Sequence, residues 1–231
     1  MLIGMLGLER ARLVCLCGAG GKTSLLFALA GCFAARGERV LVTTTTKLAA
    51  HETELAPRGV TLSHAGRTAD GQKVLGHPPE RIDELKAAGS FDRLLVEADG
   101  AARRPLKAPA GHEPVVPTTT DAVVVVAGMS GLGRPLAEDT VFRADLWASL
   151  SGTRLGAPVN PESFARVAVH AEGLAKGCPA GAHAVLLLNQ AETAAARATA
   201  VAIARLIASS RSPFHRVLSG RLQPSPQVVA L

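Results

Sequence analysis

The segment from Gly18 to Thr23 combines the residue types that hold a triphosphate. It reads GAGGKT and stands between an apolar run and a stretch with helical periodicity. Glycines let backbone N–H groups approach phosphate oxygens, and a helix N-terminus adds partial positive charge. Lys22 could reach the β- and γ-phosphates, and Thr23 could ligate Mg²⁺. We therefore predict that a nucleotide binds at Gly18, Ala19, Gly20, Gly21, Lys22, Thr23 and Ser24.

This glycine segment is a short form of the Walker A loop. The strict pattern has another glycine five residues before Gly21, where this chain has Leu16. The remaining GxxGKT also resembles the loop of Mur ligases (GTNGKT), which activate a carboxylate by phosphorylation. An ATP-dependent ligase or transferase is therefore an alternative function, although such enzymes need extra domains for their second substrate. The other alternative is a tight turn whose lysine is only solvated.

An acidic pair follows the apolar stretch 91–97, where the chain reads VEADG over residues 96–100. A carboxylate at the end of a buried strand beside the phosphate loop holds Mg²⁺ directly or through water. We predict that Glu97 binds Mg²⁺ together with Thr23, and that Asp99 has a catalytic or water-positioning role beside Lys22. The alternative is that the acidic residues only mark the end of a strand.

Four threonines, residues 43–46, follow the apolar stretch that begins at Arg39. In phosphate-switch proteins a loop at this place supplies a hydroxyl to Mg²⁺ and responds to the γ-phosphate. We take Thr45 as the candidate Mg²⁺ ligand, and one of the four threonines as an alternative to Asp99 for placing water. A β-branched strand end would give the same pattern without any ligand.

The segment from Asn189 to Glu192 reads NQAE and follows the apolar run 184–188. G-proteins read guanine at this place with NKxD, whose acid accepts hydrogen bonds from the base. Here Gln190 replaces the lysine and Glu192 replaces the aspartate. We predict that Asn189, Gln190 and Glu192 contact the base, and the choice between ATP and GTP stays open. The alternative is a helix start, with Asn189 as the cap and Glu192 three residues on.

Alternating strands and helices must position these groups. An α/β fold with one mostly parallel sheet and helices on both faces, a three-layer P-loop NTPase-like architecture, is expected in a single domain over residues 1–231. The expected strands are 12–17, 39–43, 91–97, 121–127, 184–188 and 214–218, with short edge strands at 60–63 and 73–75. The expected helices are 23–36, 79–88, 141–150, 161–170 and 191–208.

The stretch 98–120 is long, polar and rich in proline, and loops of this length in a compact domain are usually functional. It directly follows the strand that ends in Glu97, and ligands bind at the carboxyl ends of parallel strands. Its cations suit a second anionic ligand, such as a phosphate-bearing cofactor or an oxyanion. The candidates are Arg103, Arg104, Lys107, His112 and Glu113. The alternative is a solvated loop whose path the prolines fix.

The composition excludes several classes of protein. Hydrophobic residues make up 48% of the chain, which is too many for a disordered one. The net charge of +6 comes from scattered residues, and aromatics are only 3%, so nucleic acid is not an expected partner. No apolar stretch is long enough to span a membrane, and a cytoplasmic protein is expected. Cys15 and Cys17 are interpreted as small buried hydrophobes.

In this order the segments resemble the YqeC family, accessory proteins of selenium-dependent molybdenum hydroxylases. The matching stretches are CGAGGKTSL (17–25), VTTTTKL (42–48), VEADGAARRPLKAPAGHEPVVP (96–117), GMSGLGRPL (128–136) and LLLNQAE (186–192). The resemblance implies a P-loop NTPase fold and a role in maturing a molybdenum hydroxylase or its cofactor. The ExxG and NQAE segments are also similar to nickel-insertion GTPases, which couple nucleotide state to handing over a metal centre.

The sequence therefore favours a Mg²⁺-dependent ATP- or GTP-binding maturation factor that hydrolyses its nucleotide slowly without a partner. An acyl-phosphate or adenylylated product would instead favour the ligase. Strongly salt-dependent affinity for DNA or RNA would favour a third alternative, a non-enzymatic nucleic-acid-binding module. The client protein and the oligomeric state are not predicted.

Overall fold

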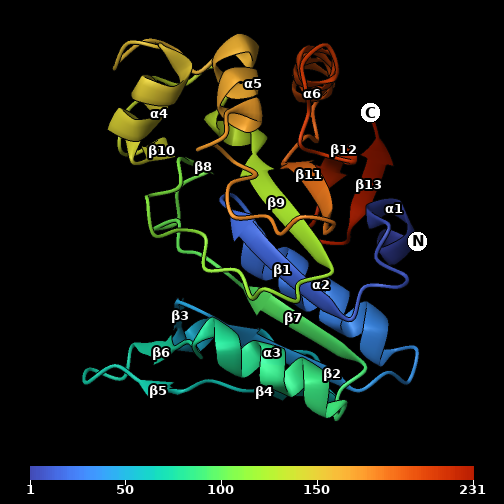
Figure 1. Ribbon diagram of the computed structural model, residues 1–231. Coiled ribbons are helices and arrows are strands. Elements are labelled where there is room, and N and C mark those ends of the chain that lie inside the picture. Colours follow the sequence, from blue (N-terminus) through green and yellow to red (C-terminus); the bar gives the residue numbers. More distant parts are fainter.

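An eight-stranded sheet forms the centre of the computed structural model, which describes residues 1–231 (Figure 1). In spatial order its strands are β13 (Gln227–Ala230), β12 (Arg216–Arg221), β11 (His183–Asn189), β9 (Ala122–Gly128), β1 (Leu13–Gly18), β7 (Arg93–Glu97), β2 (Val40–Thr44) and β4 (Val60–Leu62). Every neighbouring pair is parallel except β12 with β13. The expected mostly parallel sheet is confirmed.

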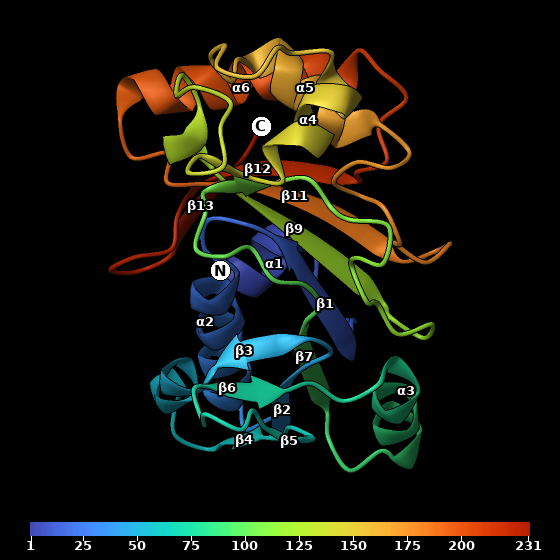
Figure 2. The ribbon, with the colours of Figure 1, turned by 90° about the vertical axis from the view of Figure 1, so that its left-hand side faces the viewer.

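Helices cover both faces of this sheet (Figure 2). One face carries α1 (Leu2–Leu6) and α2 (Lys22–Ala34). The other face carries α3 (Pro79–Ala88), α4 (Ala144–Ser151), α5 (Pro161–Val169) and α6 (Ala194–Ala208). A hydrophobic core lies on each face of the sheet, and strand β1 contributes alternate residues to both. Leu13 and Cys15 pack into one core, and Val14 and Leu16 pack into the other. The three-layer arrangement is therefore confirmed.

The cysteines of β1 serve packing. Cys15 and Cys17 are both buried in the core between the sheet and α3–α6. Burial raises the pKa of the Cys15 thiol to about 12, and it raises that of Cys17 as well. Both thiols therefore stay protonated and behave as small apolar side chains.

A small separate sheet lies beyond the end of β2, at the lower left of Figure 1. It consists of β3 (Lys47–Ala49), β6 (Lys73–Leu75) and β5 (Gly66–Arg67), all antiparallel, and a 3₁₀ helix, η1 (Ala50–Leu55), follows β3. Leu48 and Val74 are buried and fix the β3–β6 pair. The expectation that residues 73–75 form an edge strand of the main sheet is wrong. We call residues 47–55 together with residues 66–75 the outer lobe.

Two helix starts also differ from expectation. Residues Val141–Phe142 form β10, which pairs with β8 (Leu106–Lys107), so α4 begins at Ala144. Helix α6 begins at Ala194, because Thr193 caps it by accepting a hydrogen bond from the Ala196 amide at 3.0 Å. A second 3₁₀ helix, η2 (Met129–Gly131), follows β9. None of the helices combines the length and the apolar character needed to cross a membrane.

Candidate functional site

The glycine loop joins the end of β1 to the start of α2. Its first intrahelical hydrogen bond runs from the Leu25 amide to the Gly21 carbonyl at 3.0 Å. The amides of residues 22–24 therefore have no acceptor within the helix and are available to an anion. Gly20 and Gly21 have φ values of 74° and 135°, and a Cβ at Gly21 would stand 2.3 Å from the Asn189 amide nitrogen. Only glycine fits this turn.

The first two residues of the predicted phosphate loop have a different role. The Gly18 amide donates to Asp99 Oδ2 at 3.0 Å, and the Ala19 amide donates to the Val126 carbonyl at 2.8 Å. Both donors are therefore occupied, which corrects the expectation that Gly18 and Ala19 bind phosphate. They anchor the loop to the two neighbouring strands, whereas residues 20–24 line a cavity.

Lys22 is the central cation of the loop and is only 6% exposed. Its Nζ donates to the Gly18 carbonyl at 2.8 Å and lies 3.3 Å from Asp99 Oδ1 and 3.8 Å from Glu97 Oε1. Burial alone would lower the pKa of Lys22, but the two carboxylates outweigh it and raise the pKa above its ordinary value. Lys22 therefore stays charged.

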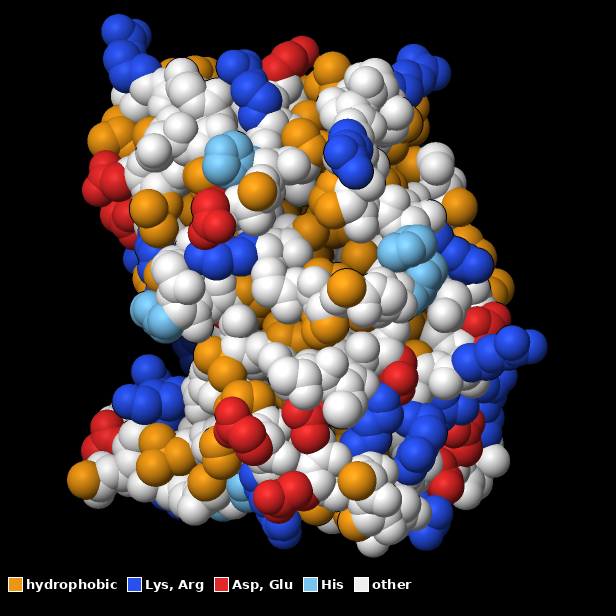
Figure 3. Space-filling model, in the orientation of Figure 1, with side chains coloured by type: hydrophobic (Ala, Val, Ile, Leu, Met, Phe, Trp, Pro, Cys, Tyr) orange, Lys and Arg blue, Asp and Glu red, His pale blue; other side chains and the backbone are white.

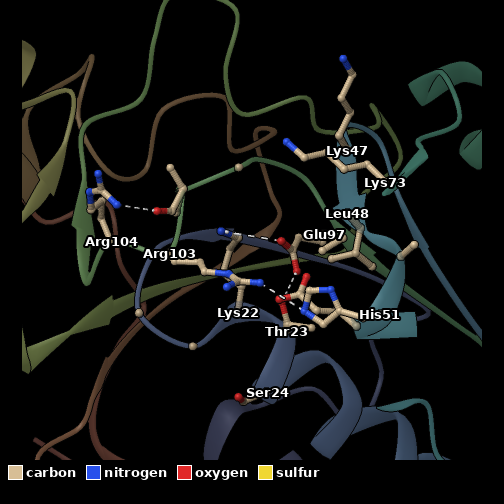
Figure 4. A pocket seen from close by; sticks show the side chains of 18 of the residues that line it. Lys22, Thr23, Ser24, Lys47, Leu48, His51, Lys73, Glu97, Arg103 and Arg104 are labelled. Atoms are coloured by element: carbon tan, nitrogen blue, oxygen red, sulfur yellow. Dashed lines mark hydrogen bonds and ion pairs between the residues drawn. The ribbon is translucent and has the colours of Figure 1, made fainter. Parts of the chain in front are cut away.

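Thr23 and Glu97 meet at the start of α2. The Thr23 hydroxyl donates to Glu97 Oε2 at 3.0 Å, and both side chains line the cavity (Figure 4). Burial raises the pKa of Glu97, although the Lys22 charge and the Thr23 hydroxyl partly offset this. The structure thus brings together the hydroxyl and the carboxylate that the sequence assigned to Mg²⁺.

Asp99 lies behind the loop instead of in the cavity. It is 2% exposed, and its carboxylate faces the Gly18 amide, Lys22 and Lys107, the last at 2.8 Å. These contacts correct the prediction that Asp99 positions water, because no side of its carboxylate reaches the cavity. Asp99 holds the loop and its lysine in place.

A chain of buried ion pairs continues from Asp99. Lys107 Nζ lies 2.8 Å from Glu113 Oε2, which also accepts from Arg143 Nη1 at 2.6 Å. Burial opposes ionisation of Glu113, but hydrogen bonds from Arg143 and Lys107 outweigh it and lower its pKa to about 2. Lys107 and Glu113 were predicted to bind a second ligand, and the structure instead places them in this internal chain. His112 is exposed and lies outside the cavity.

Two of the four threonines at the end of β2 use their hydroxyls in contacts with backbone carbonyls. The Thr45 hydroxyl donates to the Val115 carbonyl at 2.7 Å, and the Thr44 hydroxyl donates to the Glu97 carbonyl at 2.8 Å. None of residues 43–46 lines the cavity. The prediction of Thr45 as a Mg²⁺ ligand, and of a threonine that places water, therefore finds no support in this arrangement.

The three residues of the NQAE segment that were predicted to contact the base do not lie together, and only Gln190 lines the cavity. Asn189 donates from Nδ2 to the Gly20 carbonyl at 2.8 Å and so braces the phosphate loop. Gln190 has a φ of 66° and lines the cavity, where its Oε1 accepts from the Ser130 hydroxyl at 2.6 Å. Glu192 borders a separate hollow of about 240 Å³ that Gly220 and Arg221 also line.

The cavity has a volume of about 910 Å³, within the range of small-molecule sites. The phosphate loop forms one wall, and the outer lobe with the start of the 98–120 loop forms the other. The basic side chains of that second wall are Lys47, His51, Lys73, Arg103 and Arg104 (Figure 4). Arg103 and Arg104 were predicted from the sequence. The other three were not identified from the sequence. They are brought together by the pairing of β3 with β6, which are far apart in the sequence and are not joined by a recognisable turn motif.

The sequence matches one family model and one curated relative. The family model, described as "YqeC protein", matches residues 14–145. The relative is "Uncharacterized protein YqeC" of Escherichia coli (strain K12), which is 35% identical over 197 residues. That match covers 79% of this chain and 77% of the relative.

Solved structures with a similar fold include two FtsY proteins. Chloroplast FtsY from Physcomitrella patens aligns over 92% of this chain with a TM-score of 0.50 and 16% identity. FtsY from Mycoplasma mycoides aligns over 96% with a TM-score of 0.46 and 16% identity. The chain spans 60% and 65% of those two chains respectively. The likeness to chloroplast FtsY shows the fold, a mostly parallel sheet between helical layers in a P-loop NTPase-like architecture.

Proposed function

This chain belongs to the YqeC protein family, and we propose that it binds a nucleoside triphosphate with Mg²⁺ at residues 20–24 and hydrolyses it. The observation that carries the proposal is the 3.0 Å contact between Thr23 and Glu97 beside the buried Lys22. A single nucleotide-binding domain over residues 1–231 forms part of the proposal, because the central sheet runs from β4 to β13.

The residues present fit the groups that this function requires. Thr23 and Glu97 supply the hard oxygen donors that Mg²⁺ prefers, and they already lie together at the cavity wall. When bound there, Mg²⁺ would neutralise negative charge on the β- and γ-phosphates. The free amides of residues 20–24 and the cation of Lys22 would bind the phosphate oxygens.

Lys22 must change partners when a triphosphate binds. It now donates to the Gly18 carbonyl, and its ammonium group would turn toward the phosphates while Asp99 keeps its ion pair with Lys107. Asp99 would therefore remain neutralised after Lys22 leaves. This second cation lowers the cost of releasing the lysine, because a buried carboxylate without a partner is strongly destabilising.

The base would lie on the side of the loop where Asn189 ends β11 and Gln190 follows it. The side-chain amide of Asn189 donates to the Gly20 carbonyl, so Asn189 would position the phosphate loop and would not contact the base itself. Gln190 lines the cavity and is the side chain of this segment placed to contact the base. Neither residue distinguishes ATP from GTP, so both nucleotides belong in any test.

Release of phosphate from ATP and from GTP tests this function. We expect Mg²⁺-dependent release that chelation by EDTA abolishes and that Glu97→Gln lowers by at least about a hundredfold. Glu80→Gln on the exposed surface of α3 is the matched control and should retain the wild-type rate. Equal rates for the two variants would refute the role of Glu97, and no release from either nucleotide would refute hydrolysis by the isolated chain.

We further propose that this activity serves the maturation of a selenium-dependent molybdenum hydroxylase or its cofactor. The support is the family membership together with the segments that resemble nickel-insertion GTPases. Copurification from the native cell, with mass spectrometry of bound proteins and metals, tests the role. Recovery of a hydroxylase subunit or its cofactor is the expected result, and recovery of neither would count against it.

A further inference from the structure

The second wall of the cavity is strongly basic. We call Lys47, His51, Lys73, Arg103 and Arg104 the outer wall. Against these four Lys and Arg side chains, the same wall has one carboxylate in the cavity lining, that of Glu52. None of these four cations forms an ion pair with any carboxylate. The wall therefore carries positive charge that the protein itself does not neutralise.

The sheet order separates the outer wall from the base side of the phosphate loop. Asn189 ends β11, which lies two strands from β1 in one direction, and Lys47 follows β2, which lies two strands away in the other. Glu97 ends β7, on the same side as Lys47. A nucleotide whose base lies beside Gln190 would place its terminal phosphate toward Glu97 and leave the outer wall beyond it unfilled.

Arg103 lines the cavity from a segment with an unusual backbone conformation. Ala102 and Arg103 have φ values of 46° and 59°, a left-handed conformation that non-glycine residues adopt only at a cost in energy. The Arg103 guanidinium lies 3.2 Å from His51 Nε2, so the 98–120 loop and the outer lobe touch above Lys22 (Figure 4). Figure 3 shows the opening as a hollow on the left of the molecule, with Lys or Arg side chains at its lower edge.

We propose that the outer wall binds a second, phosphate-bearing small molecule beside the terminal phosphate of the nucleotide. This inference rests on the proposed function for the position of the nucleotide. Arginine binds phosphate oxygens in pairs, and lysine supplies a mobile point charge. Arg103 orients the second phosphate, and Lys47 and Lys73 hold it from the far side of the cavity. Arg104 already donates from Nε and Nη1 to the Glu138 and Ala102 carbonyls, so it contributes its charge and its remaining nitrogen.

Calorimetric titration with inorganic pyrophosphate tests the inference. The full chain is first saturated with Mg²⁺ and a non-hydrolysable analogue of whichever nucleotide binds, and pyrophosphate is then added. We expect one further equivalent to bind. The double variant Lys47→Ala, Lys73→Ala should weaken that binding by at least about tenfold, since a hydrogen bond to a charged group contributes about 1.5–3 kcal/mol. Circular dichroism verifies that the variant is folded.

The double variant Arg36→Ala, Arg58→Ala is the matched control. It also removes two exposed cations, but these follow α2 and precede β4, at the amino ends of the parallel strands, and neither lines the cavity. It should bind pyrophosphate as the wild type does. No second equivalent in the loaded wild type, or equal losses in both double variants, would overturn the inference.

A second arm separates this inference from the proposed function. Lys22→Ala without nucleotide removes the phosphate-loop cation and leaves the outer wall unchanged. Pyrophosphate binding by this variant, lost on adding Lys47→Ala and Lys73→Ala, would support the outer wall even if no nucleotide bound the wild type. Absence of binding in this arm would overturn the outer wall while leaving nucleotide binding at the loop intact.

Discussion

The two walls of the cavity differ in whether their charged side chains form ion pairs. In the phosphate-loop wall and behind it, Lys22, Asp99, Lys107 and Glu113 are all buried and all ion-paired. In the outer wall, the lysines and arginines have no carboxylate partner, and most of them are exposed. The buried ion pairs hold the phosphate loop in a fixed geometry. The outer wall leaves charge available for a ligand that the protein does not contain.

This difference predicts where substitutions act on stability and where they act on binding. Breaking a buried ion pair leaves an uncompensated charge and costs about 3–5 kcal/mol. Removing an unpartnered surface charge changes stability by less than about 0.5 kcal/mol. The predictions below use this contrast, each with a control that the chain itself offers.

Glu113→Gln should have the largest effect on stability. It leaves Arg143 without a carboxylate and Lys107 with Asp99 alone, so we expect the free energy of unfolding to fall by about 3–5 kcal/mol in chemical denaturation. Glu52→Gln removes a carboxylate from the outer wall that forms no ion pair and should cost less than about 0.5 kcal/mol. Equal losses of unfolding free energy in the two variants would show that the ion pairs behind the phosphate loop contribute no more to stability than an unpaired carboxylate of the outer wall.

Asn189→Asp should have an intermediate effect. The aspartate keeps the shape of the side chain but cannot donate to the Gly20 carbonyl, so we expect a loss of about 1–3 kcal/mol in the free energy of unfolding. Asn160→Asp is the control, because Asn160 caps α5 by accepting from the Ser163 amide and aspartate accepts equally well. If both variants melt at the wild-type temperature, Asn189 does not brace the loop.

The pH dependence of stability should show the buried chain of ion pairs directly. Folding lowers the pKa of Glu113 from 4.5 to about 2, so its contribution is present above pH 4.5 and is lost as the pH falls toward 2. The slope should approach about 1.4 kcal/mol per pH unit in that window. Glu113→Gln should lack this component, and identical pH profiles for wild type and variant would exclude a lowered pKa for Glu113.

Local sequence patterns predicted the central sheet, the phosphate loop and the Thr23–Glu97 pair. Each of these follows from a run of neighbouring residues: apolar strands, a glycine turn before a helix, and a carboxylate at the end of a strand. The order of strands and helices then places the loop and Glu97 at the same edge of the sheet.

The remaining features depend on contacts between distant residues. Lys107 and Glu113 look like solvated loop charges in the sequence, and only the pairing of β8 with β10 buries them against Asp99 and Arg143. Asp99 looks like a catalytic or water-positioning group for the same reason. The outer lobe requires β3 to pair with β6 across 23 intervening residues, and no local pattern marks that pairing.

Calorimetric titration of Mg²⁺–ATP and Mg²⁺–GTP into the wild-type chain tests the central claim most directly. The account predicts that at least one nucleotide binds at a single site and that Lys22→Ala weakens the binding by at least about a hundredfold, since it removes the charge-assisted contacts of a buried cation. Arg58→Ala removes an exposed cation that lies at the amino ends of the strands and outside the cavity, and it should bind as the wild type does. Heats of dilution alone with both nucleotides, or binding that Lys22→Ala leaves unchanged, would contradict the account.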